Sequence, residues 1–361
     1  MMPDVHAGKG CVIGFTSQIK NKVIPNLVGV DLGCGMLVVK IGEKDIDFKK
    51  LDDVIKRFVP NGQEVHEARL HKFTELPRLE CYRVLKDTKR IDRSLGTLGG
   101  GNHFIEIGRD EFENNYLIIH SGSRNLGKQV AEYYQNLAFE LNQGAEVLIE
   151  ERNKIIENYK KEGRKSEIQK VLSDLSRNFK LNTPTPPKDL YFLDGEYMES
   201  YLNDVEICQK YAYLNRFYIA EAIISNMGFS EIDRFETIHN YIEDKVIRKG
   251  AISAKKGEKV LIPINMRDGS IVAIGKGNED WNCSAPHGAG RIMSRNKARE
   301  VLNMKDFEES MVGVFTTSVT EETIDEAPMT YKPIDEILEN IKDTVDVLTI
   351  LKPVYNFKSH K

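Results

Sequence analysis

Residues 31–41 are Asp31-Leu-Gly-Cys-Gly-Met-Leu-Val-Val-Lys-Ile41, a glycine-rich turn followed by an apolar run. The run Met36–Ile41 is rich in Val and Ile and contains neither Gly nor Pro, so we predict a buried strand. The turn before it places a carboxylate and a thiol three residues apart, where glycines let the backbone wrap closely around a cation. An Asp in a turn usually only caps the backbone, so the turn alone indicates a metal site weakly.

Working outward from this turn, the chain alternates short strands with helices. Strands are predicted over Gly10–Phe15, Leu27–Val30, His103–Ile107, Tyr116–His120, Lys259–Pro263 and Ser270–Ile274. Helices are predicted over Asp47–Phe58, Gly127–Gln143, Glu146–Lys180 with a break near Gly163, Tyr201–Met227 and Ile334–Leu351. They do not follow a regular β-α-β period, which favours an α+β fold: one large, irregular mixed-sheet domain over residues 1–361.

A helical arm at about residues 129–187 is expected as a hairpin inserted in this domain, closed by the stiff linker Thr183-Pro-Thr-Pro-Pro187. From Arg152 to Lys180 the arm carries nine basic residues against four acidic ones, but acids just before them offset much of that charge. We favour a solvated hairpin over an arm that contacts RNA.

The composition is that of an ordinary globular protein of 361 residues, with 40% apolar residues and a net charge of −4. That charge gives no global attraction to nucleic acid, so a polyanion would need a local basic patch. Five scattered cysteines predict free thiols and no disulfide. Since no signal-like or membrane-spanning apolar run is present, we expect a cytoplasmic protein.

Four histidines, His103, His120, His239 and His287, are predicted at strand ends or in polar turns, where catalytic groups concentrate. With Asp31 and Cys34 they would suit Mn²⁺, Zn²⁺ or Fe²⁺, and one thiolate can bridge two ions. Two such ions can clamp the attacking and leaving oxygens at phosphorus. A closed structural zinc site is the alternative, but ligands spread so widely along the chain favour a catalytic centre. His287 itself could either ligate a metal or attack a phosphorus.

Three glycine-rich turns could receive phosphate through backbone N–H groups, although none matches a Walker P-loop. They are Gly96–Asn102, Ser121–Gly127 and His287–Gly290. Arg124 and Arg291 each follow a candidate histidine closely and could supply fork contacts to RNA phosphate.

Together these segments carry a resemblance to a known family. The motifs are Met2-Pro-Asp-Val-His-Ala-Gly8, Val28-Gly-Val-Asp-Leu-Gly-Cys-Gly35, Gly96-Thr-Leu-Gly-Gly-Gly-Asn-His-Phe-Ile-Glu106, His120-Ser-Gly-Ser-Arg124, Arg248-Lys-Gly-Ala251, Gly275-Lys-Gly-Asn278 and His287-Gly-Ala-Gly-Arg-Ile-Met-Ser-Arg295. In this order they resemble the RtcB family of tRNA-splicing and RNA-repair ligases.

The resemblance implies a GTP- and Mn²⁺-dependent ligase that joins an RNA 3′-phosphate or 2′,3′-cyclic phosphate to a 5′-hydroxyl. His287 would be the nucleophile that carries GMP covalently. Cys34 would bridge two Mn²⁺ ions, one also held by His103 and His120 and the other by Asp31 and His239. Broken tRNA or another cleaved RNA would be the substrate, an archease-like activator is a candidate partner, and we expect a monomer.

The family's GMP contacts fall on residues spread over most of the chain. They are Asn102, His103, Phe104, Ile105, Glu106, His239, Asn240, Pro263, Ile264, Asn265, Met266, Ser270, His287, Gly288, Ala289, Gly290, Tyr331 and Lys358. Glu106 would accept from the guanine edge, and Tyr331 would stack on the base.

The chain departs from the family pattern in three places. A longer segment usually precedes the first motif, so we expect an N-terminally short member. The usual Pro-Gly-Ser-Met-Gly loop is replaced by Pro263-Ile-Asn-Met-Arg-Asp268, which adds charge where GMP is expected. The arm is longer than in bacterial members, which favours a variant ligase with its own substrate.

Two other functions fit the same residues. A dinuclear-metal phosphoesterase acting on RNA or nucleotide would need no covalent histidine. A non-catalytic RNA-binding descendant is disfavoured because the ligand set is intact.

Overall fold

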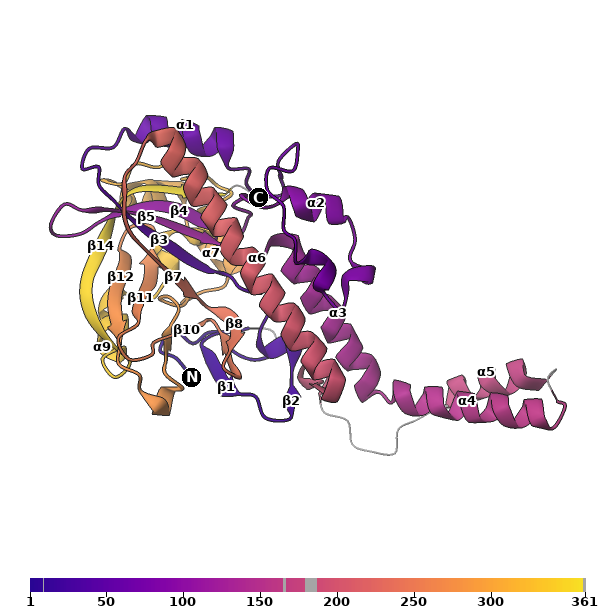
Figure 1. Cartoon of the computed structure of the whole chain (residues 1–361). Coiled ribbons are helices and arrows are strands. Elements are labelled where there is room, and N and C mark those ends of the chain that lie inside the picture. Colours follow the sequence, from indigo (N-terminus) through magenta and orange to yellow (C-terminus); the bar gives the residue numbers. More distant parts are fainter. Residues whose placement is uncertain (9, 165–166, 179–186, 360–361) are drawn as a thin grey trace.

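The computed structural model describes residues 1–8, 10–164, 167–178 and 187–359. A seven-stranded sheet forms its centre, in the order β11, β12, β14, β4, β5, β3, β7 (Figure 1). In that order the strands are Lys259–Asn265, Gly269–Gly275, Val345–Lys358, Phe104–Arg109, Asn115–Ser121, Gly35–Ile41 and Glu231–Ile238. The two edge strands of this sheet lie close to each other. The backbone N–H of Leu261 in β11 donates to Thr237 Oγ1 of β7 at 3.1 Å. The sheet therefore curls into a half-barrel.

Side chains alternate between the two faces of this sheet, as the pleat of a strand requires. On one face, Leu37, Ile105 and Ile119 pack with apolar residues of α1 (Phe48–Phe58) and α6 (Gly195–Met227). On the other, Phe104 packs in a cluster that draws on strands from β11 to β7, so this face is the inside of the curl. Helices α1 and α6 thus cover the outer face of the sheet and leave its inner face uncovered by these two helices.

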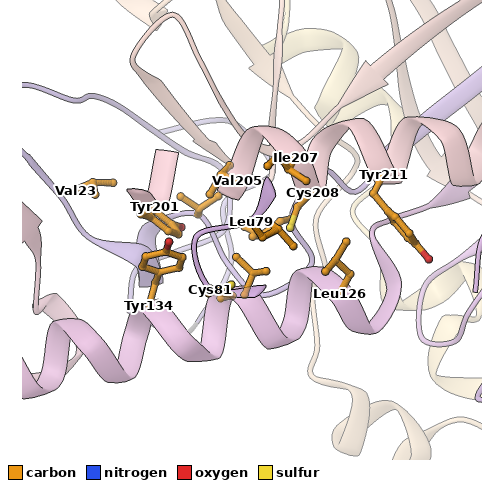
Figure 2. Close-up of a cluster of buried hydrophobic side chains, with 14 of the residues drawn as sticks. Val23, Leu79, Cys81, Leu126, Tyr134, Tyr201, Val205, Ile207, Cys208 and Tyr211 are labelled. Carbon is orange, nitrogen blue, oxygen red and sulfur yellow. The ribbon is translucent and has the colours of Figure 1, made fainter. Parts of the chain in front are cut away.

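Helix α6 is long and has buried residues on several sides, because it crosses two cores. Its C-terminal part packs on the sheet, and its N-terminal part packs on α3 (Arg124–Asn142). Figure 2 shows the second contact, where Tyr201, Cys208 and Tyr211 of α6 face Leu126 and Tyr134 of α3. None of the described helices is both long and apolar enough to cross a membrane.

Smaller elements surround the half-barrel. Three short antiparallel sheets join β1 (Phe15–Gln18), β9 (Val246–Lys249) and β8 (Asn240–Glu243); β10 (Ala251–Ser253) and β13 (Ser284–Pro286); and β2 (Lys22–Val23) and β6 (Leu193–Asp194). The remaining helices of the body are α2 (Thr88–Arg93), α7 (Arg295–Val301), α8 (Met304–Ser310) and α9 (Ile334–Asn340). Strand β13 ends directly before His287 and so positions it.

Two helices, α4 (Ala145–Lys161) and α5 (Ile168–Asn178), extend away from the body as a hairpin (Figure 1). The predicted break near Gly163 is confirmed, since this glycine lies between the helices with a φ of +76°. The chain leaves the body at the end of α3 and returns near Phe192. These two points are joined by a hydrogen bond, in which Asn142 Nδ2 donates to the carbonyl of Phe192 at 2.7 Å. We expected a stiff linker over Thr183–Pro187 after the hairpin. Of these residues the structure describes only Pro187.

The α+β class is confirmed, but several predicted elements are wrong. The expected mixed sheet is antiparallel at every described pairing of its strands. Leu27–Val30 is not a strand, because Pro25 opens a single 3₁₀ turn that ends at Leu27. The strand expected over Gly10–Phe15 begins only at Phe15.

The largest error is the C-terminal helix expected over Ile334–Leu351. Helix α9 ends at Asn340, and β14 begins at Val345. The run from Val345 to Leu351 is rich in β-branched residues and lies between β12 and β4, where pairing on both sides outweighs the helical spacing of its apolar residues.

Candidate active site

A buried cluster of side chains that could hold a metal ion lies at the ends of β3, β4 and β5, and we call it the metal cluster. The donor atoms of Cys34, His103 and His120 all lie within 4.8 Å of one another. Cys34 Sγ is 3.2 Å from His120 Nε2 and 3.5 Å from His103 Nε2. Asp31 Oδ2 lies 3.1 Å from His103 Nε2, and His239 Nε2 lies 3.4 Å from His120 Nε2. The structure thus brings together all five residues that the sequence suggested as metal ligands.

Backbone carbonyls orient two of these imidazoles. His103 Nδ1 is 2.8 Å from the carbonyl of Leu98, and His120 Nδ1 is 3.0 Å from that of Asn102. A carbonyl can only accept, so both Nδ1 atoms carry the proton and both Nε2 atoms present lone pairs to the cluster. Lone pairs that converge on one another, with a thiol and a carboxylate beside them, suit a bound cation.

Burial shifts the pKa of three groups in this cluster. Burial, together with the other histidines, holds the pKa of His120 well below its usual range. For His239, burial and the neighbouring His287 do the same. Burial and then the Asp31 charge raise the pKa of the Cys34 thiol well above its usual range.

Helix α6 holds the loops that carry these ligands. Asn215 Oδ1 accepts from the backbone N–H groups of Gly96 and Thr97 at 2.8 and 3.0 Å, and its Nδ2 donates to the carbonyl of Gly122 at 3.1 Å. Arg216 Nη1 donates to the carbonyls of Gly33 and Ser121 at 2.8 and 2.6 Å. Both side chains are fully buried. One helix therefore fixes three loops relative to one another.

Position 122 requires glycine because the Asp31 carboxylate lies very close to its backbone. A Cβ there would lie 2.2 Å from Asp31 Oδ1, so only glycine leaves room for this carboxylate beside the end of β5.

His287 lies beside this cluster and is held from its other side by Asp4. Its ring centroid is 5.0 Å from that of His239. His287 Nδ1 is 2.5 Å from Asp4 Oδ2, and the Asp4 carboxylate is fully buried. An ionised carboxylate can only accept, so Nδ1 carries the proton and Nε2 keeps its lone pair free. Since the His287 side chain is still 18% exposed, that lone pair is accessible to a ligand.

A cavity of about 580 Å³ extends from the metal cluster past His287. This volume suits a nucleotide-sized ligand. Most of the residues that the resemblance suggested as GMP contacts line it: Asn102, Phe104, Glu106, Pro263, Ile264, Asn265, Met266, Ser270, His287, Gly288, Ala289, Gly290, Tyr331 and Lys358.

Four suggested contacts do not line the cavity. His103 and His239 belong to the metal cluster, and the Ile105 side chain packs in the core on the opposite face of the sheet. Asn240 Oδ1 accepts from the backbone N–H of Gly250 at 3.0 Å.

The far end of the cavity holds a buried polar network. Glu326 Oε2 accepts from Lys358 Nζ at 2.9 Å and from the Tyr331 hydroxyl at 2.6 Å. Burial acts to raise the pKa of Glu326, but the charges of Lys358 and Arg295 outweigh it and lower that pKa to about 2. For Glu106, burial dominates and raises the pKa to about 8.

The two arginines suggested for RNA phosphate are both engaged by the protein. Arg124 Nη2 donates to the carbonyl of Gly62 at 3.0 Å, and its Nε donates to Thr97 Oγ1 at 3.1 Å. Arg291 Nη2 donates to the carbonyl of Asp325 at 2.6 Å, and its guanidinium lies over the Tyr331 ring at 5.3 Å. Arg291 lines the cavity, whereas Arg124 braces a loop behind the metal cluster.

The variant loop between β11 and β12 does not bring charge into the cavity, contrary to our expectation. Arg267 and Asp268 pair with each other at 2.7 Å, and neither lines the cavity. Asn265 Oδ1 accepts from both of their backbone N–H groups and so closes the turn.

The sequence alone did not assign three residues of this site. Asp4 lies in the first motif, but nothing local indicates that it pairs with a histidine 283 residues away. Asn356 and Glu326 also line the cavity, and neither stands in a recognisable motif. The only available signal was the position of Asn356 two residues before Lys358, on the same face of a strand.

Comparison with known proteins gives consistent matches over the whole chain. The family model described as tRNA-splicing ligase RtcB matches residues 1–88 and 81–359. RNA-splicing ligase RtcB of Escherichia coli (strain K12) is 31% identical over 396 residues, which cover 98% of this chain and 88% of that protein. RNA-splicing ligase RtcB2 of Escherichia coli (strain ATCC 25922) is 24% identical over 390 residues, with 99% and 87% covered. tRNA-splicing ligase RtcB of Pyrobaculum aerophilum is 26% identical over 433 residues, with 94% and 82% covered. This chain therefore belongs to the RtcB family of tRNA-splicing ligases.

Proposed function

We propose that this protein is a GTP- and Mn²⁺-dependent RNA ligase that joins RNA 3′-phosphate or 2′,3′-cyclic phosphate ends to 5′-hydroxyl ends. The single observation that carries the proposal is the placement of His287. Its Nδ1 is held by Asp4, its ring lies beside the metal cluster, and it lines a nucleotide-sized cavity. An imidazole with a free, oriented Nε2 is equipped to attack phosphorus.

The donor set supports two manganese ions. Thiolate, carboxylate and imidazole together suit a borderline divalent cation. Cys34 lies beside His103 and His120 and also contacts Asp31, so two ions could share it. His103 and His120 would complete one site, and Asp31 and His239 the other. When bound, the ions would supply positive charge to the phosphate oxygens that react.

In the first step, the cavity holds GTP with its α-phosphorus in line with His287 Nε2. The P–N bond forms, the bond from the α-phosphorus to the bridging oxygen breaks, and pyrophosphate leaves with the electron pair. Nδ1 keeps its proton, and Asp4 stabilises the positive charge that develops on the ring. The product is a covalent histidine-GMP.

In the next steps the guanylate moves to RNA. A cyclic phosphate end must first be opened by water to a 3′-phosphate. An oxygen of that 3′-phosphate then attacks the guanylate phosphorus, and the P–N bond breaks to restore His287. Finally the 5′-hydroxyl oxygen attacks the 3′-phosphate phosphorus and loses its proton, and GMP leaves. Every step is a displacement at phosphorus, so one set of ions and dipoles serves all of them.

The test is incubation with GTP, Mn²⁺ and a cleaved tRNA that bears a 2′,3′-cyclic phosphate and a 5′-hydroxyl. We expect a single joined product that requires GTP and is absent with His287→Ala. A phosphoesterase would open the cyclic phosphate without joining the ends and without any need for GTP. An RNA-binding protein without catalysis would leave both ends unchanged.

A further inference from the structure

In the described part of the chain, three residues that line the cavity each have a buried polar atom without a hydrogen-bond partner. These atoms are Glu106 Oε1, Asn356 Oδ1 and Ser270 Oγ. A buried polar atom without a partner is costly, and native proteins rarely leave one. When several such atoms belong to residues around one cavity, the simplest explanation is that a bound ligand, with a small adjustment of these side chains, supplies the missing hydrogen bonds.

Two of the three atoms belong to side chains on adjacent strands that are hydrogen-bonded to each other. Asn356 on β14 is the cross-strand partner of Glu106 on β4, and Phe104 pairs with Lys358 two residues along. Asn356 Nδ2 donates to Glu106 Oε2 at 2.8 Å. The two side chains are 1% and 2% exposed, so adjacent strands hold both in place. The contact leaves one oxygen of each side chain without a partner. The Asn356 oxygen is an acceptor, and the Glu106 oxygen accepts when the carboxyl group is ionised.

We propose that Asn356 is a specificity-determining residue that reads the 2-amino group of guanine beside Glu106. The inference rests on the proposed function and adds to it a residue for base selection. Guanine presents two neighbouring donors, N1–H and the N2 amine, which match two neighbouring acceptors. Hypoxanthine keeps N1–H but lacks the amine, and adenine presents a bare N1 acceptor. Asn356 also donates to Glu106 and so fixes which carboxylate oxygen faces the base.

The experiment compares equilibrium binding of GMP, IMP and AMP, with Mn²⁺, to the full chain. A site built to hydrogen-bond an N–H rejects an analogue that lacks it, so wild type is expected to bind GMP at least about tenfold more tightly than IMP. Asn356→Leu, of similar volume, removes the acceptor and should bring the GMP-to-IMP ratio close to one.

The control is Asn226→Leu, the same change at an exposed position of α6, which should bind all three nucleotides like wild type. Circular dichroism and thermal unfolding check that each variant folds. Equal binding of GMP and IMP by wild type, or no binding of either, would overturn the inference, and this arm needs no variant. An unchanged ratio in folded Asn356→Leu would overturn it as well.

Guanylylation of His287 is followed in parallel samples of the same proteins with GTP and Mn²⁺, which separates the two claims. A wild-type protein that prefers GMP over IMP but never becomes guanylylated contradicts the proposed function alone. A guanylylated protein whose base preference ignores Asn356 contradicts the role of Asn356 alone.

Discussion

At the scale of single residues, the contact between Asp4 Oδ2 and His287 Nδ1 determines which ring nitrogen is free to react. Asp4→Asn keeps the shape of the side chain but removes the charge that stabilises the ring as the P–N bond forms. We expect guanylylation to slow on the order of a hundredfold or more. The rate of protein labelling by radiolabelled GTP measures it. Bound Mn²⁺ should not change, because Asp4 lies outside the metal cluster; an unchanged labelling rate would remove Asp4 from the chemistry.

Glu106 predicts a pH dependence of stability. Burial raises its pKa to about 8, so between about pH 4.5 and 8 the folded chain holds a proton that the unfolded chain has lost. Its contribution to the free energy of unfolding therefore falls as the pH rises through this window. Glu106→Gln cannot titrate. As the pH rises from 5 to 8, its free energy of unfolding should therefore increase relative to that of wild type, by on the order of 4 kcal/mol. Urea unfolding of both proteins at the two pH values checks this, and a pH-independent difference would contradict it.

Also at the scale of single residues, the sequence predicts which residues are candidate metal ligands better than it predicts their contacts. Asp31, Cys34 and the histidines could be chosen because each stands in a glycine-rich turn or at a strand end, which are local features. The partner of His287 could not be chosen, because the pairing depends on how the first motif folds back across the molecule. Arg124 and Arg291 were chosen by position alone, and in the structure nearby carbonyl groups accept from both of them. Their contact with RNA phosphate stays a prediction.

At the scale of elements, helix α6 braces the metal loops through Asn215. Asn215→Leu keeps the volume but leaves the N–H groups of Gly96 and Thr97 and the carbonyl of Gly122 without this partner. We expect unfolding to become easier by about 3 kcal/mol and Mn²⁺ affinity to fall, because the loops lose their register. Denaturant unfolding and metal titration measure the two effects. Asn226→Leu on the same helix is the control, and native stability and affinity in Asn215→Leu would show that the brace is dispensable.

The α4–α5 hairpin should be separable from the catalytic body. Its two ends of attachment lie close together, since Asn142 Nδ2 contacts the carbonyl of Phe192. Replacing residues 146–186 with a short Gly/Ser linker should therefore leave the thermal midpoint within a few degrees and guanylylation unchanged. If the hairpin is only solvated, ligation of a cleaved tRNA will also be unchanged. A selective loss of ligation would contradict that reading and favour an arm that contacts RNA.

The elements also show where sequence patterns stop being informative. Asp47 was a sound choice for the start of a helix, because its side chain accepts from the backbone N–H of Lys50 at 3.0 Å. β14 was missed, because a run that lies between two strands gains its stability from partners distant in the sequence. The curl of the sheet was equally hidden, since a strand pattern records which side chains are buried and not which strands become neighbours.

At the scale of the whole molecule, the half-barrel collects one site from the full length of the chain. The metal cluster comes from the ends of β3, β4 and β5 together with His239, His287 follows β13, and Asp4 and Lys358 come from opposite ends of the described chain. Motif order predicted that these segments cooperate. It could not predict the buried pair of Glu106 and Asn356, because that pair arises only when β4 lies beside β14.

The central claim is that His287 carries GMP covalently, and mass spectrometry of the protein after incubation with GTP and Mn²⁺ tests it most directly. We predict one guanylate per chain, mapped to His287, with pyrophosphate released in equal amount. The adduct should disappear in His287→Ala. Wild-type protein with bound Mn²⁺ and no adduct, or an adduct that persists in His287→Ala, would contradict the account.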